Sequence, residues 1–419
     1  MAPPRLRLPV AVLMLVTAGA TSGLLTTSPA PAAGADDFEI TLPAQVANVS
    51  DIAVGPNGDV ILGGITMDAD FPTTPDAVDR TCGARLGCHS DREDGFVMIL
   101  SGDGTMRYST FVGADGEEHG VFVAFAADGS VWAVLGNTRF YEYERGSGLC
   151  NGRQPVLMRI MPGSSSVSGL TCIGGPAADG VVTDLAVAPD GSVWVVGSGQ
   201  GMQTVNAWQP VSGRSLDLFI ARYAAGRQEP LLLTYVGGSG DESAGSLALT
   251  GDGDVVVSGT TSSPDFPVVR PIELPSPGTA GSGGGPSDAV LLRLDATGRW
   301  LEYSTTIGGS SFEVGRGVAV DADGNVYLAG ETRSPDFPVS VGTAKTQSLG
   351  SEIDGFLVSL DTVGRLRFSS VFGGASTDIA EFVVASRRGP LLVFGYTNSP
   401  DFAVVPGIPM TPAFGRPLA

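Results

Sequence analysis

One unit recurs along this chain, and the recurrence restricts the fold more than any other feature. Each copy has an apolar run, a turn that contains Asn-Gly or Asp-Gly, and a second apolar run that ends in Gly. The turn glycines follow one another at intervals of 71, 62, 62, 71 and 65 residues: Gly58, Gly129, Gly191, Gly253, Gly324 and, in a degenerate copy, Gly389. Asp-Gly and Asn-Gly supply the positive φ angles of tight hairpin turns, so the flanking runs are predicted strands.

Two more predicted strands lie between successive hairpins, for example 96–100 with 107–112, 289–294 with 301–307, and 356–360 with 366–372. Four strands per period make one antiparallel sheet per repeat. Such a sheet cannot bury both faces alone, and radial stacking of the sheets gives a propeller. We therefore expect an all-β propeller of about six four-stranded blades over residues 36–410. With the hairpins as the inner strands, residues 38–42 would complete the last blade and close the ring.

Several segments resemble bacterial SBBP β-propeller repeats: Asp-Ala-Val-Leu-Leu-Arg-Leu-Asp-Ala-Thr-Gly at 288–298, Tyr-Ser-Thr-Thr-Ile-Gly-Gly at 303–309, the hairpin at 317–330 and Thr-Arg-Ser-Pro-Asp-Phe-Pro at 332–338. The resemblance covers nearly all of residues 51–402 and is weakest over 121–210. The family name implies seven blades, whereas the sequence has six hairpins, so a seventh blade stays open. The resemblance implies the fold and brings neither an enzymatic activity nor catalytic residues.

The first 35 residues have the pattern of a secretory signal peptide. Arg5 and Arg7 precede an apolar stretch at 8–25, and small residues follow at 29–35. Polar residues dilute the apolar stretch, which favours cleavage over a retained membrane anchor. We predict a secreted or cell-surface protein with a short tail at 411–419 and no membrane span after cleavage.

The charge of the chain restricts the classes of partner that it can bind. The formal net charge is −20, and Lys345 is the single lysine. Phosphate backbones would repel such a chain, which argues against nucleic acid. An extracellular protein or a glycan fits better, bound by a monomer, and the acidity by itself also promotes solubility.

Four cysteines in an exported chain predict two disulfides, Cys82 with Cys88 and Cys150 with Cys172. His89 follows Cys88 and raises zinc as an alternative, but no second Cys or His pair stands at the spacing of a zinc finger.

Acids recur four residues after the second glycine of the Gly-Gly-like loops: Glu117, Asp179, Glu242, Glu313 and Asp378. In a four-stranded meander these loops share a face with the long loops after each second strand, and we call it the loop face. A carboxylate ring there could hold Ca²⁺ or a cationic ligand. The alternative, which we favour, is that each acid caps its own turn.

A second recurrent acid precedes phenylalanine in the long loops, at Asp70, Asp265, Asp336 and Asp401. Here we predict that the ring anchors the loop and that the acid binds local amides. Trp132 and Trp194 occupy equivalent hairpin positions, and packing between blades explains them better than sugar stacking.

Catalysis has little support in the sequence. The chain has two histidines and no G-x-S-x-G motif. His119 beside Glu117 and Glu118 could act as an acid–base pair, although solvated loop residues would look the same. The sequence favours a non-catalytic binding or scaffold propeller that uses the loop face. A polysaccharide- or glycoside-active lyase or hydrolase, with carboxylates at the channel mouth, is the alternative.

Overall fold

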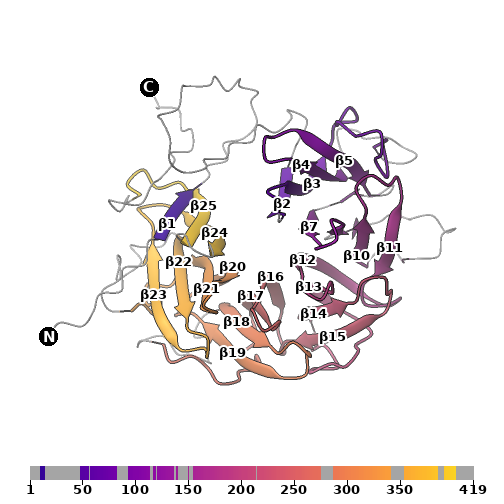
Figure 1. Ribbon diagram of the computed structural model, residues 1–419. Coiled ribbons are helices and arrows are strands. Elements are labelled where there is room, and N and C mark those ends of the chain that lie inside the picture. Colours follow the sequence, from indigo (N-terminus) through magenta and orange to yellow (C-terminus); the bar gives the residue numbers. More distant parts are fainter. Residues whose placement is uncertain are drawn as a thin grey trace.

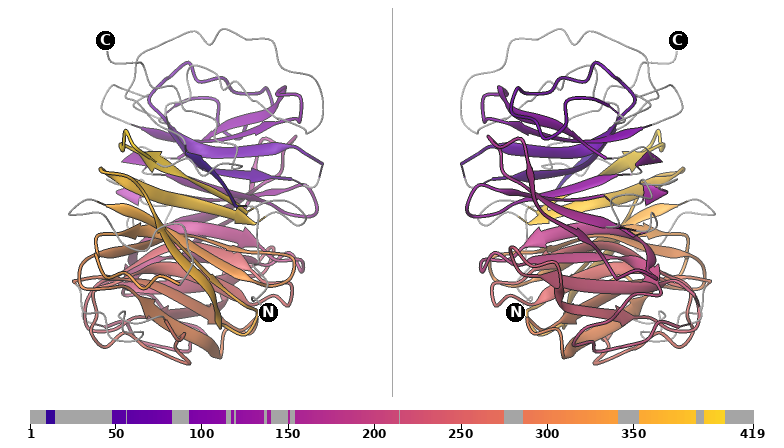
Figure 2. Two further views of the ribbon diagram at one scale, coloured as in Figure 1. Left: turned by 90° about the vertical axis from the view of Figure 1, so that its left-hand side faces the viewer. Right: turned by 90° about the vertical axis from the view of Figure 1, so that its right-hand side faces the viewer.

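A computed structural model describes residues 10–14, 48–55, 57–82, 93–113, 117–118, 120–135, 138–139, 150, 154–213, 215–274, 286–340, 353–385 and 391–402. These residues form strands and no helix. Six sheets stand radially around a common axis (Figure 1), and the side views show strands running along that axis (Figure 2). The described part of the chain is therefore an all-β propeller, as the repeat predicts.

Five sheets are complete four-stranded blades, and each follows the chain from the inside of the ring outward. Blade 1 has β2 (Asn48–Val54), β3 (Val60–Thr66), β4 (Asp94–Leu100) and β5 (Met106–Val112); blade 2 has β7 (Val121–Phe125), β8 (Val131–Leu135), β10 (Val156–Ile160) and β11 (Val167–Cys172); blade 3 has β12 (Asp179–Val187), β13 (Val193–Gln200), β14 (Asp217–Tyr223) and β15 (Pro230–Val236); blade 4 has β16 (Glu242–Leu249), β17 (Val255–Thr261), β18 (Asp288–Leu294) and β19 (Leu301–Ile307); and blade 5 has β20 (Glu313–Val320), β21 (Val326–Thr332), β22 (Asp354–Leu360) and β23 (Leu366–Phe372).

The sixth sheet has three described strands. It contains β24 (Asp378–Ala385), β25 (Leu391–Thr397) and β1 (Val10–Met14), and β1 runs parallel to β25 while every pairing within the other blades is antiparallel. A two-stranded ribbon joins β6 (Glu117–Glu118) to β9 (Thr138–Arg139). Strand β1 comes from the segment that the sequence predicts as a signal peptide. Residues 38–42, predicted to close the ring, lie outside the described residues.

The predicted hairpins form the two innermost strands of each blade. The inner strands of successive blades contact one another, as β12 does β16 and β16 does β20. The turn glycines adopt positive φ angles, 80° at Gly191 and 88° at Gly253 for example, which only glycine takes without strain. This part of the prediction is confirmed, while Gly389 lies outside the described residues.

The cores lie between blades. One buried cluster joins Trp194 and Leu218 of blade 3 to Val257 and Val290 of blade 4, and similar clusters join the other neighbours. Trp132 and Trp194 are 2% and 0% exposed, so packing between blades accounts for both. Because the sheets of blades 2 to 5 pack on both sides, their central strands are apolar on both faces.

The first blade lacks a described neighbour on one side. Ile52 of β2 is 58% exposed, whereas Leu247 and Val318, which stand at the same position of β16 and β20, are 6% and 5% exposed. No helix in the described residues is long and apolar enough to cross a membrane.

Candidate functional site: paired carboxylates on the loop face

The recurrent acids after the Gly-Gly loops are buried at the start of the inner strands. Glu242 is 1% exposed, and its Oε2 accepts a hydrogen bond from the amide of Gly238 at 3.0 Å. Its Oε1 accepts the hydroxyl of Thr261 at 2.6 Å and that of Ser263. The carboxylate thus caps the Gly-Gly loop and joins it to the loop that follows the second strand.

The same hydrogen-bonded arrangement of a carboxylate, a glycine amide and a hydroxyl, which we call the lock, recurs in the next two blades. Glu313 accepts the amide of Gly309 at 3.1 Å and the hydroxyl of Thr332 at 2.6 Å. Asp378 accepts the amide of Gly374 at 2.6 Å and the hydroxyl of Ser399 at 2.7 Å. For these three acids the structure supports turn capping, the reading that the sequence favours.

A second carboxylate from the preceding blade stands beside each of these acids. Asp217 begins β14 and approaches Glu242, Asp288 begins β18 and approaches Glu313, and Asp354 begins β22 and approaches Asp378. The first glycine of each Gly-Gly loop lies between the two carboxylates. A Cβ built on Gly237 would lie 2.7 Å from Oδ2 of Asp217 and 2.5 Å from Oε2 of Glu242, so these two oxygens are no farther apart than the sum of those distances.

The pairs Asp217–Glu242 and Asp288–Glu313 each place two acids in a crevice between blades without a basic partner among the described residues. Asp217 is 0% and Asp288 4% exposed, and Oδ1 of each has no hydrogen-bond partner in the described part of the chain. Burial and then the charge of Glu313 raise the pKa of Asp288 to about 7. Burial also raises the pKa of Glu313, although hydrogen bonds from Ser334, Thr332 and Gly309 oppose it.

Two ionised carboxylates so close together are costly away from water, so one of them takes up a proton or the pair binds a cation. The residue at the equivalent position of blade 2 favours protonation of one carboxyl over binding of a cation. Gln154 stands at the position of Asp217 in blade 2 and donates its amide to the carbonyl of Gly175. A neutral hydrogen-bond donor thus replaces one acid of the pair at that crevice.

The predicted carboxylate ring is therefore not a ring of solvated acids. Glu242, Glu313 and Asp378 lie in separate crevices between blades and are at most 1% exposed. Asp179 begins β12, and Glu117 lies in β6, where its backbone pairs with Arg139. Among the described residues, no group of three or more His, Cys, Asp or Glu side chains is placed to hold a metal ion. Calcium binding stays a prediction for these five acids.

The acids of the Asp-Phe elements also belong to the loop face. Oδ1 of Asp265 accepts the amide and the hydroxyl of Ser239, both at 2.8 Å, and Oδ1 of Asp336 binds Ser310 in the same way. The prediction of local amides is wrong in detail, because these amides belong to the Gly-Gly loop 26 residues upstream. The rings of Phe266 and Phe337 are 5% and 4% exposed, which agrees with the predicted anchoring of the loops.

Asp217, Asp288 and Asp354 are not among the site residues that the sequence predicts. Their sequence signal is a fixed distance, since Asp217 and Asp288 precede their partners by 25 residues and Asp354 precedes Asp378 by 24. Such a spacing acquires meaning only when the ends of strands from two different blades are known to meet.

A further pair of acids lies on the inner strands. Oδ2 of Asp51 accepts the amide of Val123 at 2.8 Å, and Oδ2 of Asp184 accepts the amide of Leu247 at 2.8 Å. Each bond joins one inner strand to the inner strand of the next blade. Burial, with a smaller contribution from Asp51, raises the pKa of Asp184 to about 7. Both acids stand next to a β-bulge that interrupts the pairing of their strand.

The remaining predicted residues divide between described and undescribed parts. Cys150 and Cys172 form a disulfide with their Cα atoms 5.6 Å apart. Cys82 is also disulfide-bonded, and Cys88, its predicted partner, lies outside the described residues. His89 and His119 lie outside them as well, so the acid–base alternative built on His119 is untested.

Comparison with known proteins agrees with the repeat architecture. The family model for the SBBP β-propeller repeat matches residues 302–338, which cover β19 to β21 and the Asp-Phe loop. This segment of the chain is therefore similar to an SBBP β-propeller repeat. No curated protein sequence matches it.

Several solved structures are similar to this chain at low sequence identity. A protein of unknown function from Dyadobacter fermentans is 12% identical with a TM-score of 0.41, over 79% of this chain and 96% of that one. A protein of unknown function from Bacteroides caccae is 10% identical with a TM-score of 0.36, over 77% and 81%. Virginiamycin B lyase from Staphylococcus aureus, solved with quinupristin, is 10% identical with a TM-score of 0.38, over 83% and 92%. At these values the neighbours carry no information on the function of this protein.

Proposed function

We propose that this SBBP propeller is an exported, monomeric, non-catalytic binding or scaffold protein whose partner docks on the loop face. The observation that carries the proposal is the lock that recurs in blades 4, 5 and 6. Carboxylates, hydroxyls and glycine amides bind one another there, which leaves the loop face rigid and its acids engaged. A rigid framework that carries long loops is the usual architecture of a binding surface.

The disulfides and the charge support export and a partner outside the cell. The bond between Cys150 and Cys172 persists in oxidising compartments. A formal net charge of −20 favours a protein partner with basic residues or a neutral glycan.

Site-specific photocrosslinking tests the assignment of the face. The probe is a benzophenone amino acid at Val211, which is 71% exposed in the loop between β13 and β14 on the loop face. The matched control carries the same amino acid at Val363, which is 65% exposed in the turn between β22 and β23 on the opposite face. Both variants are incubated with the extracellular fraction of the source cells.

We expect one reproducible crosslinked protein or glycan from Val211 and none from Val363. Crosslinking from Val363 alone would overturn the assignment of the face. In parallel, the unmodified protein is incubated with a panel of polysaccharides. Release of reducing ends or unsaturated products, lost in Glu117→Gln, would replace the scaffold by the enzyme alternative.

A further inference from the structure

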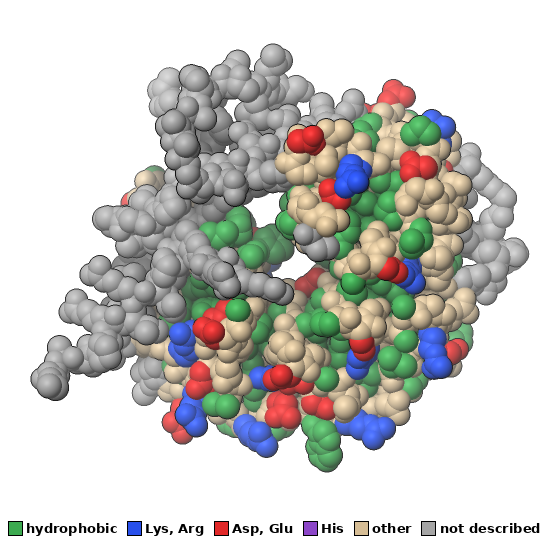
Figure 3. All heavy atoms as spheres, in the orientation of Figure 1, with side chains coloured by type: hydrophobic (Ala, Val, Ile, Leu, Met, Phe, Trp, Pro, Cys, Tyr) green, Lys and Arg blue, Asp and Glu red, His purple; other side chains and the backbone are tan. Residues whose placement is uncertain are grey.

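Arginine side chains join neighbouring blades on the face opposite the loop face, which we call the turn face. Arg222 of β14 binds Asp190 of its own blade at 2.6 Å, and its guanidinium lies 5.1 Å from the ring centroid of Trp194. It also donates to the carbonyl of Ala296, in the next blade, at 2.6 Å. Acidic and basic side chains lie side by side toward the rim of the molecule in Figure 3.

The next crevice repeats this arrangement. Arg293 of β18 binds Asp254 at 2.6 Å and donates to the carbonyl of Thr362 at 2.9 Å. Ala296 and Thr362 are both the second residue after the third strand of their blade. The crevices between blades 3 and 4 and between blades 4 and 5 therefore each have a seat for a guanidinium group, built from an acid of one blade and a carbonyl of the next.

Blade 1 lacks the arginine that would fill its seat. Ile99 pairs with Ile61 in the register in which Arg222 pairs with Trp194 and Arg293 with Val256. Pro162, the second residue after β10, stands where Ala296 and Thr362 stand. Instead of a guanidinium group, the crevice between blades 1 and 2 holds a cavity of about 430 Å³.

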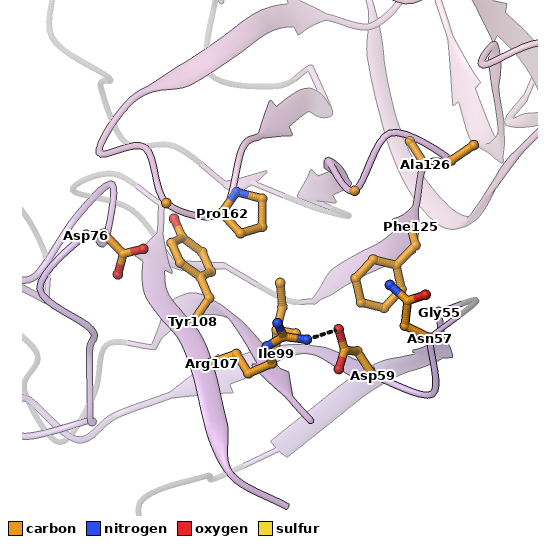
Figure 4. A pocket seen from close by; sticks show the side chains of 13 residues that line it. Gly55, Asn57, Asp59, Asp76, Ile99, Arg107, Tyr108, Phe125, Ala126 and Pro162 are labelled. Atoms are coloured by element: carbon orange, nitrogen blue, oxygen red, sulfur yellow. Dashed lines mark hydrogen bonds and ion pairs between the residues drawn. The ribbon is translucent and has the colours of Figure 1, made fainter. Parts of the chain in front are cut away.

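The walls of this cavity suit an alkylguanidinium group. Figure 4 shows Tyr108 and Pro162 on one side, Phe125 on the other and Ile99 between them. Asp59, the turn acid, also lines the cavity. Its Oδ2 binds Arg107 at 2.6 Å, while no hydrogen bond to its Oδ1 occurs among the described residues.

The charges around the cavity leave one acid unbalanced. Asp59 pairs with Arg107, and Asp128, beside the cavity, pairs with Arg159. Asp76 lines the cavity near Tyr108 and has no ion pair in the described part of the chain (Figure 4). A cation with an apolar stem would pair with the carboxylate of Asp76, contact the aromatic rings of the walls and donate a hydrogen bond to a backbone carbonyl.

We propose that the cavity between blades 1 and 2 is a binding site for an arginine side chain presented by a polypeptide partner. The guanidinium would lie between Asp59, Asp76 and the carbonyl of Pro162, with its methylene stem over Phe125 and Ile99. The partner supplies the group that Arg222 and Arg293 supply within the chain. This site lies on the turn face and is independent of the loop-face proposal.

Calorimetric titration of the full-length protein with N-acetyl-arginine methylamide tests the site. The control ligand is the citrulline analogue, which has the same shape without the charge. We expect one bound ligand per chain and about tenfold weaker binding of the citrulline compound or of Asp76→Asn. Asp254→Asn, at a crevice that is already filled, is the matched control and should leave the affinity unchanged.

Two further variants make the test decisive. Ile99→Arg restores the missing arginine, so it should abolish binding and raise the melting temperature. Arg222→Ile empties the seat between blades 3 and 4 and should raise the stoichiometry from one to two. Equal binding of the citrulline compound, unchanged affinity in Ile99→Arg, or no binding of the arginine compound would each overturn the proposal. None of these results bears on crosslinking from Val211.

Discussion

Replacing Asp288 by Asn tests whether the buried carboxyl pairs hold a proton. The pKa of Asp288 is raised from 3.8 to about 7, first by burial and then by the charge of Glu313. The unfolded chain therefore loses this proton at lower pH than the folded chain. The contribution of Asp288 to stability is then favourable below about pH 4 and is lost progressively as the pH rises toward about 7.

The size of the effect follows from the shift. One pKa unit corresponds to about 1.4 kcal/mol, so a shift of about three units gives at most about 4 kcal/mol between acid and neutral pH. Asn keeps the shape and donor capacity of a protonated carboxyl and does not ionise. We expect the variant to match the wild type near pH 4 and to exceed its free energy of unfolding by about 2 to 3 kcal/mol at pH 8.

Urea unfolding of both proteins from pH 4 to pH 8.5 measures this difference. The titrations are run first with EDTA and then with roughly 1 mM Ca²⁺, a concentration that fills calcium sites of extracellular proteins. A variant that is less stable than the wild type at pH 8, or a difference that does not change with pH, would refute the shared proton. If Ca²⁺ stabilises the wild type and not the variant, a cation balances the pair instead, as the sequence analysis allowed.

Three other predictions concern the loops and the covalent link. Gly308→Ala should destabilise the fold by about 2 to 4 kcal/mol in chemical unfolding, because its Cβ would lie within 2.5 Å of oxygen atoms of both paired carboxylates. The control is Gly251→Ala, whose Cβ would have no atom within 4 Å and which should change stability by less than about 0.5 kcal/mol. Asp295→Asn should cost about 1 kcal/mol at pH 7, and this cost should shrink as the pH falls below the usual pKa of an aspartate, as measured by melting experiments. Burial opposes the shift, but hydrogen bonds from its own turn hold the pKa of Asp295 below the usual value, so its stabilisation is lost as the pH falls through that lowered pKa. Cys150→Ser, which opens the bridge to Cys172, should lower the free energy of unfolding by about 3 kcal/mol and make it insensitive to reductant at this bridge; equal stability of oxidised wild type and variant would contradict this.

The buried pairs also explain why the Gly-Gly loops need their first glycine. That residue passes between two carboxylates from different blades, and any side chain would displace one of them. Glycine is required there by its neighbours, whereas in the hairpin turns it is required by the positive φ of its own backbone.

The strands, the hairpins and the radial stacking of the sheets can be read from the sequence. These features depend on local chemistry, namely Asp-Gly turns and apolar runs of strand length, and on a period too long for any other common stack of sheets. The predicted strands at 96–100 and 356–360 begin only two residues late, because each starts at a buried aspartate that the apolar pattern does not include.

The pairing of the buried acids depends on contacts between blades. Asp288 begins β18 of blade 4 and Glu313 begins β20 of blade 5, and they meet because the two blades pack side by side. The vacant arginine seat has the same origin, since Ile99 is an ordinary core residue in sequence and becomes informative only beside Arg222 and Arg293 in the same register. Contacts between repeats depend on how the sheets are rotated about the axis, and no local pattern in one repeat records that rotation.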